Sequence, residues 1–188
     1  MQTLNCRGQL IDLSKPKVMG IINITPDSFY DGGKTFSEKE ILKQAEKLLS
    51  EGATFLDVGG YSTRPGTEEV SEKDEIERAA GAIETILKSF PQALISVDTF
   101  RSEVAKKAVE AGAAIVNDVS GGTLDAEMYK VVAKLKVPYI LMHMRGNPKT
   151  MAKLTEYKNV TIDVLKDLAE KIALAKSEGI NDIIADPG

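Results

Sequence analysis

Six short apolar runs in this sequence each lead into a side chain that can bind or polarise a ligand. These side chains belong to Asn23, Asp57, Asp98, Asn117, His143 and Asp186. A carboxylate beside apolar strand residues is costly to bury unless hydrogen-bond donors surround it. The aspartates therefore predict a ligand or a protein partner rich in N–H groups. The amide of Asn117 donates and accepts at once, which suits the mixed edge of a heterocycle.

The first apolar run continues into a loop that is dense in polar and turn-forming residues. Positions 20–33 read G-I-I-N-I-T-P-D-S-F-Y-D-G-G, which places Phe29 and Asp31 beyond the run. This composition indicates a surface loop, and its length is typical of a lid over a binding site. For Asn23, at the end of the run, a bond to its own loop backbone is an equally good interpretation.

A second loop follows the next apolar run, and positions 57–66 read D-V-G-G-Y-S-T-R-P-G. Its two glycines allow the backbone to approach a ligand closely, and Ser62, Thr63 and Arg64 supply donors. The guanidinium of Arg64 matches the geometry of a carboxylate or a phosphate. The alternative is a tight turn with a solvated arginine, but the complete string is far more specific than its G-G pair.

Other polar positions have simpler interpretations. His143 is the single histidine, and a lone histidine at a strand end favours a structural role over catalysis. Met144 either packs against a flat ligand ring or fills the core, and the sequence supports both equally. Asp118 fits the N-cap of a helix better than a ligand contact. The charged segment 68–78 is interpreted as a solvated helix face.

Short β-branched runs alternate along the chain with longer segments of helical periodicity. The predicted strands occupy residues 18–24, 55–58, 94–97, 115–117, 139–143 and 183–185. Two of the apolar helix stripes are Ile41, Leu42, Ala45, Leu48 and Leu49, and Ile162, Leu165, Leu168 and Ile172. Ser37 with Glu40, and Ser71 with Asp74, have the spacing of capping boxes. The alternation predicts an α/β protein with a parallel sheet.

Two architectures fit this alternation, an open doubly wound sheet and a (β/α)8 TIM barrel. An open sheet gathers its ligand groups at one switch point, whereas a barrel brings the carboxyl end of every strand to one mouth. Polar groups follow nearly every predicted strand, and no G-x-G-x-x-G follows the first one. The barrel is therefore favoured.

The barrel is expected to be incomplete, because a barrel of this type needs about 250 residues. The chain has 188 residues and ends just after the sixth predicted strand, so strands seven and eight would be absent. We predict one domain over residues 1–188 that lacks its C-terminal portion. Residues 4–13 predict a small β-hairpin before the first barrel strand.

Composition excludes several classes of function. A formal net charge of -4 gives no basic footprint for nucleic acid. No apolar run approaches the roughly 18 residues of a membrane span, and residues 1–10 lack the features of a signal peptide. The single cysteine, Cys6, excludes a disulfide within the chain, so a cytoplasmic location is expected.

Taken together and in this order, these strings resemble the dihydropteroate synthase family, whose members join a pterin to p-aminobenzoate in folate biosynthesis. T-P-D-S-F followed by G-G-x-S-T-R-P-G carries most of the resemblance, which C-R-G and M-H-M-R-G-N-P extend over all 188 residues. One departure is Tyr61, where the family often has glutamate. The family's basic residues on strands seven and eight have no counterpart here, which implies that these 188 residues alone are inactive.

The resemblance also implies a reaction and a role for each candidate residue. The reaction condenses 6-hydroxymethyl-7,8-dihydropterin diphosphate with p-aminobenzoate and releases diphosphate, with Mg2+ held by Asn23. The substrate-binding residues would be Phe29, Asp31, Asp57, Thr63, Arg64, Pro65, Asp98, Asn117, Met144 and Asp186. Of these, the catalytic residues would be Arg64, Asp98, Asn117 and Asp186. In this family diphosphate is thought to leave before the amine attacks, and members are usually homodimers.

Two rival interpretations remain open from the sequence. A pterin-binding barrel that transfers a methyl group from methyltetrahydrofolate to a corrinoid would share the pterin-facing aspartates and asparagine. It would have no reason to carry both loops. A non-catalytic paralogue should have lost a metal or loop residue, and Asn23, Asp31, Thr63 and Arg64 are all present.

Overall fold

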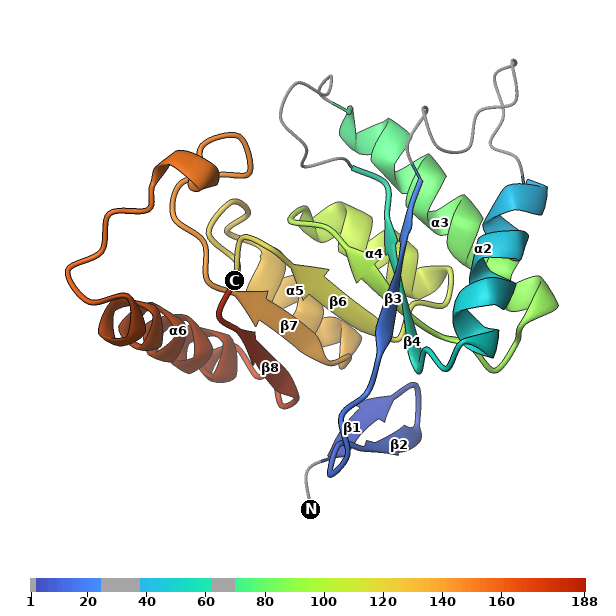
Figure 1. Ribbon diagram of the computed structural model, residues 1–188, viewed down its shortest axis with the longest axis horizontal. Coiled ribbons are helices and arrows are strands. Elements are labelled where there is room, and N and C mark those ends of the chain that lie inside the picture. Colours follow the sequence, from blue (N-terminus) through green and yellow to red (C-terminus); the bar gives the residue numbers. More distant parts are fainter. Residues whose placement is uncertain (1–2, 25–37, 62–69) are drawn as a thin grey trace.

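The computed structural model describes residues 3–24, 38–61 and 70–188, and its main feature is a six-stranded sheet (Figure 1). The strands are β3 (Met19–Asn23), β4 (Phe55–Gly59), β5 (Leu94–Asp98), β6 (Ile115–Asp118), β7 (Tyr139–Met142) and β8 (Ile183–Asp186). They follow one another in chain order, and every neighbouring pair is parallel. A doubly wound sheet would reverse this order at a switch point. The observed order is that of six consecutive barrel strands, which confirms the predicted architecture, and each predicted strand is correct to within one residue at either end.

The predicted hairpin is also present. Strand β1 (Thr3–Cys6) pairs antiparallel with β2 (Gln9–Asp12), and the turn between them has left-handed backbone at Arg7 and Gly8. The buried side chains of the hairpin pack with the first residues of the barrel strands, in a cluster of Leu4, Cys6, Ile11, Phe55, Ala114, Ile115 and Ile140. The hairpin therefore covers the amino end of the sheet, opposite the polar strand ends (Figure 1).

Five described helices cover one face of the sheet and build the main core against it (Figure 1). They are α2 (Glu38–Ser50), α3 (Glu72–Ser89), α4 (Ser102–Glu110), α5 (Met128–Leu135) and α6 (Val160–Ser177). The side chain of Ser71 accepts a bond from the Asp74 amide at 3.1 Å, so the predicted cap of α3 is confirmed. Ser37, the other predicted cap, lies outside the described residues.

Alternate residues of each strand point to opposite faces, and this sorts the side chains by role. In β3, Ile22 packs under the helices in the main core. Gly20 lies on the same face, where an added Cβ would come within 2.9 Å of Leu48, so the close approach of α2 requires a glycine. Met19, Ile21 and Asn23 point to the other side, called the inner face below. Ile21 is 61% exposed there.

Helix α6 departs from its predicted apolar stripe. Leu168 is buried and Ile172 packs against the main core, but Ile162 and Leu165 are 48% and 62% exposed. The helix contacts β7 and β8 through its Leu168 side, and Lys171 and Ala175 complete the buried set. The predicted stripe is therefore correct at Leu168 and Ile172 and wrong at Ile162 and Leu165, because the buried face follows residues 168, 171, 172 and 175. Among the described helices, none combines the length and apolarity needed to cross a membrane.

Candidate functional site

The polar ends of four strands lie side by side on the inner face of the sheet. In the strand register, Asn23 pairs with Gly59, Gly59 with Asp98, and Asp98 with Asn117. These four residues are called the polar row below. Because the strands are parallel and in register at this level, residues 23, 59, 98 and 117 meet at one height. The sequence placed them at the strand ends but gave no information on this register.

Contacts within the polar row are close. An added Cβ on Gly59 would lie 3.4 Å from both Asn23 Oδ1 and Asp98 Oδ2, so these two side chains face each other across the glycine. Asp57 is two residues earlier on β4 and on the same face. Its Oδ2 accepts a hydrogen bond from Asn117 Nδ2 at 3.0 Å. The structure therefore joins Asn23, Asp57, Asp98 and Asn117 into one cluster.

Two carboxyl groups of this cluster, those of Asp57 and Asp98, have raised pKa values. Burial raises the pKa of Asp98 to about 8, and the nearby Asp57, Asp118 and Glu75 charges add to the rise. Burial also raises the pKa of Asp57, opposed by the neighbouring Ser96 hydroxyl and the Asn117 amide. Asp57 Oδ1 is buried and has no hydrogen-bond partner among the described residues. An N–H donor of a ligand would satisfy that oxygen and stabilise the ionised carboxylates.

Asp186 lies at the far edge of the sheet, at the end of β8. It pairs with Met142, and its Oδ1 accepts a bond from the Gly188 amide at 2.8 Å. Asn117 of the polar row pairs with Ile140, and Ile140 pairs with Ile184. Asp186 is two residues after Ile184 on β8, so it points to the same inner face. No hydrogen bond among the described residues joins it to Asp98 or Asn117.

Asp118 has a structural role, but the predicted helix N-cap is wrong, because Asp118 caps a loop. It points to the outer face of β6, where it is fully buried. Its oxygens accept bonds from the amides of Ser120 at 2.7 Å and Gly122 at 2.8 Å, and from the hydroxyl of Tyr139 at 2.6 Å. Helix α5 begins only at Met128, with Glu127 at the cap.

His143 is also satisfied by protein groups. Its Nδ1 lies 2.6 Å from Asp167 Oδ2 and its Nε2 lies 2.9 Å from the Tyr157 hydroxyl. Asp167 pairs in turn with Lys171 at 2.9 Å. Both ring nitrogens therefore have partners, which supports the structural interpretation. Met144 next to it is buried, at 7% exposure, and no ligand contact follows from its position.

The comparisons with known proteins agree with this geometry. The family model described as "Pterin binding enzyme" matches residues 19–188. The chain belongs to the pterin binding enzyme family. The match begins at β3 and includes every strand of the polar row, so the family region and the described cluster coincide.

Relatives of this family member are named for folate synthesis. The chain is 48% identical over 174 residues to the "Folic acid synthesis protein fol1" of Pneumocystis carinii, covering 91% of this chain and 23% of that protein. It is 42% identical over 191 residues to the dihydropteroate synthase of Escherichia coli, covering 98% of this chain and 66% of that enzyme. The chain thus spans between about a quarter and two thirds of these curated relatives.

Solved structures extend the likeness to the fold. A Yersinia pestis dihydropteroate synthase with a sulfonamide drug complex superposes with a TM-score of 0.89 at 39% identity, covering all of this chain and 68% of that one. The Xanthomonas albilineans enzyme in complex with 7,8-dihydropteroate gives a TM-score of 0.83 at 35% identity, covering all of this chain and 66% of that one. These enzymes are TIM barrels, so the six described strands are part of that fold.

Several residues named from the sequence lie outside the described residues. They are Phe29, Asp31, Thr63, Arg64 and Pro65. Among the residues that the structure does describe, no group of three or more His, Cys, Asp or Glu side chains is placed to hold a metal ion.

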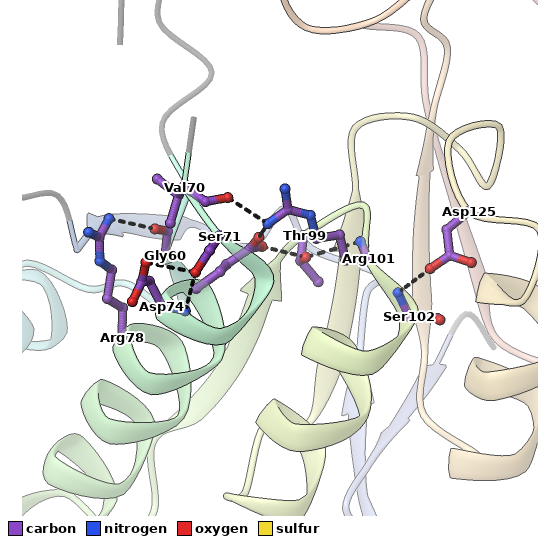
Figure 2. A network of polar contacts seen from close by, with 10 residues as sticks. Gly60, Val70, Ser71, Asp74, Arg78, Thr99, Arg101, Ser102 and Asp125 are labelled. Atoms are coloured by element: carbon purple, nitrogen blue, oxygen red, sulfur yellow. Dashed lines mark hydrogen bonds and ion pairs between the residues drawn. The ribbon is translucent and has the colours of Figure 1, made fainter. Parts of the chain in front are cut away.

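One polar network, which is centred on Glu75, was not predicted from the sequence. Glu75 belongs to the charged segment interpreted as solvated, but it is fully buried. That interpretation was wrong because Glu75 falls on the buried stripe of α3, four residues before Ala79. Its position at the start of the apolar stripe of α3 could have indicated that Glu75 is buried. Its partners are Thr99 and Arg101, directly after β5 (Figure 2).

Proposed function

We propose that this chain is the pterin-binding part of a dihydropteroate synthase. Such an enzyme condenses 6-hydroxymethyl-7,8-dihydropterin diphosphate with p-aminobenzoate. The observation that carries the proposal is the polar row with Asp57 beside it, in a barrel similar to enzymes solved with 4-aminobenzoic acid and with 7,8-dihydropteroate. We further propose that residues 1–188 form a single domain of a cytoplasmic homodimer whose remaining site residues lie in a further C-terminal portion.

The pterin would bind against the inner face of β4, β5 and β6. A pterin ring carries N–H groups and an exocyclic amine, and the buried Asp57 Oδ1 still lacks a donor. Asp98 and Asn117 offer a carboxyl and an amide at the same height. Asp186 would approach from β8. Met144, buried just after the end of β7, is proposed to pack against the ring.

Magnesium fits the oxygen donors at this end of the sheet but needs more of them than the described residues supply. Mg2+ prefers six oxygens and usually keeps several waters with substrate phosphates. Asn23 Oδ1 would provide one protein ligand, and Asp98 lies next to it. When bound, the ion would neutralise the departing diphosphate. The role of the chain itself is to place the amide oxygen of Asn23 beside the pterin site.

The proposed reaction depends on substrate positioning and on charge stabilisation more than on a nucleophilic side chain. The bond between the pterin methylene carbon and a diphosphate oxygen breaks, with its electron pair leaving on the diphosphate. The amine nitrogen then forms the new bond and loses one proton. Positive charge on the methylene during this step would be stabilised by the carboxylates of Asp57 and Asp98. Residues Phe29, Asp31, Thr63, Arg64 and Pro65 are proposed to hold p-aminobenzoate in place.

The test is conversion of labelled p-aminobenzoate by the full-length protein that contains this chain. With pterin diphosphate and Mg2+, we expect labelled dihydropteroate, inhibition by a sulfonamide that competes with p-aminobenzoate, and loss of product after chelation of the metal. A folded protein that binds a pterin but never incorporates p-aminobenzoate would contradict the proposal. Methyl transfer from methyltetrahydrofolate to a corrinoid in the same preparation would identify the rival pterin enzyme instead.

A further inference from the structure

A buried carboxylate connects α3 with the end of β5. Glu75 is fully buried in the first turn of α3. Its Oε1 accepts a bond from the Thr99 hydroxyl at 2.7 Å, and its Oε2 accepts one from Arg101 Nη1 at 2.7 Å. Burial raises the pKa of Glu75, and Thr99 and Arg101 oppose this rise. A carboxylate at this depth is tolerated only because these donors satisfy it.

Arg101 reaches two other parts of the chain at the same time. Its Nη1 also donates to the carbonyl oxygen of Val70 at 3.0 Å, as Figure 2 shows. Its guanidinium carbon lies 5.3 Å from the ring centre of Tyr61 and 5.4 Å from that of Phe100. The two rings meet edge to face, with centroids 5.2 Å apart. One side chain therefore contacts both Tyr61 and Val70, the residues on either side of 62–69.

The same network leads directly to the polar row. Thr99 follows Asp98 in the chain, and its amide donates to the carbonyl oxygen of Asn117 at 3.0 Å. The Thr99 hydroxyl also accepts a bond from the Arg101 amide at 3.1 Å. Glu75 thus holds the backbone turn that ends β5, where Asp98 projects. Displacement of Arg101 would affect both this turn and the two residues that flank 62–69.

We propose that Arg101, held by Glu75, is a positioning residue that aligns Tyr61 and Val70 with the end of β5. This inference rests on the proposed function, which assigns Thr63, Arg64 and Pro65 to p-aminobenzoate. Arg101 touches no residue of the polar row through its side chain, so it acts through Tyr61 and Val70. Its substitution should therefore affect p-aminobenzoate more than the pterin. Tyr61 has a role here as the ring against which the guanidinium packs.

The experiment compares Arg101→Met and Arg101→Lys with Lys73→Met in the full-length protein. Lys73 is on the same helix as Glu75, but its side chain is 85% exposed and pairs with Glu77. For both Arg101 variants we expect the KM for p-aminobenzoate to rise about tenfold, with the KM for the pterin diphosphate within about twofold of wild type. Arg101→Lys keeps a positive charge near Glu75, so it should fold even if Arg101→Met does not. The Lys73 variant should match wild type.

A purely structural role would give a different result. Equal changes in both KM values, or a lower melting temperature with both KM values unchanged, would overturn the inference. Hydrogen exchange of peptides covering residues 58–74 provides a second readout that needs no turnover. Faster exchange there in Arg101→Lys than in Lys73→Met is expected, and equal rates would contradict the alignment role. If wild-type protein makes no dihydropteroate, the proposed function fails while this exchange measurement still tests Arg101.

Discussion

Two buried aspartates of the barrel, one on each face of the sheet, differ in how their oxygens are satisfied. Asp118 on the outer face accepts bonds from Ser120, Gly122 and Tyr139. Asp57 on the inner face accepts one from Asn117, and its second oxygen has no partner among the described residues. Both are costly to bury. On the outer face the protein supplies the donors itself, and on the inner face we propose that a ligand supplies the missing donor.

The difference gives a criterion that separates structural acids of this chain from the acids that we propose bind the pterin. Position in the sequence does not separate them, because Asp98 and Asp118 both end a buried strand. The face does, since the outer face is packed under helices and the inner face opens toward the mouth. The same criterion classifies His143, whose ring nitrogens both have partners, with the structural group.

The largest effect is expected from removal of an inner-face acid. Asp98→Ala in the full-length protein should lower kcat/KM for dihydropteroate synthesis by about 100-fold or more, because a preorganised carboxyl group that we propose contacts the pterin is lost. Steady-state kinetics with both substrates measures this. The matched control is Asp74→Ala, whose side chain only caps α3. Wild-type kinetics in the Asp98 variant would show that the inner face is not the site.

A smaller effect on stability is expected on the outer face. Tyr139→Phe removes a donor from buried Asp118 and should lower the free energy of unfolding by about 1–3 kcal/mol. Tyr129→Phe is the comparison, because its hydroxyl donates to the uncharged carbonyl of Gly121 at 2.6 Å and should cost only about 0.5–1.5 kcal/mol. Urea denaturation measures both. Equal decreases in the free energy of unfolding of the two variants would contradict the proposed difference between the two faces. A loss of activity in Tyr139→Phe without a loss of stability would also contradict it.

Another expected effect is on the dependence of stability on pH. The raised pKa of Asp98, about 8 against an ordinary 3.8, means that the folded state keeps a proton that the unfolded state has lost. Stability from this group is therefore complete below about pH 4 and is lost as pH rises toward 8. Asp98→Asn removes this dependence, so its stability relative to wild type should increase between pH 5 and pH 9. A constant difference between variant and wild type across these pH values would mean that Asp98 titrates normally.

The sequence was sufficient for the strands, the hairpin and the barrel order, because these depend on local periodicity and on polar residues at strand ends. It also predicted that Asn23, Asp57, Asp98 and Asn117 belong to one site, and these four side chains form one cluster in the structure. It could not supply the register that brings Asn23, Gly59 and Asp98 to one height. That register depends on contacts between strands some forty residues apart in the chain.

The burial of a charged side chain was the second feature that the sequence did not predict. Glu75 was expected in solvent, since a charged helix segment is usually exposed, and only the tertiary contacts with Thr99 and Arg101 explain its burial. The exposed side of α6 was missed for a related reason. Helical periodicity marks several apolar positions, but which of them are covered depends on the elements that pack there.

The most direct test of the inner-face site is calorimetric binding of 6-hydroxymethylpterin to the full-length protein. Asn117→Ala removes the polar-row amide that donates a hydrogen bond to Asp57, whereas Tyr139→Phe alters only the outer face. We predict that Asn117→Ala weakens pterin binding by about tenfold or more and that Tyr139→Phe leaves it unchanged at temperatures where it is folded. Equal affinity in Asn117→Ala and wild type would contradict the account.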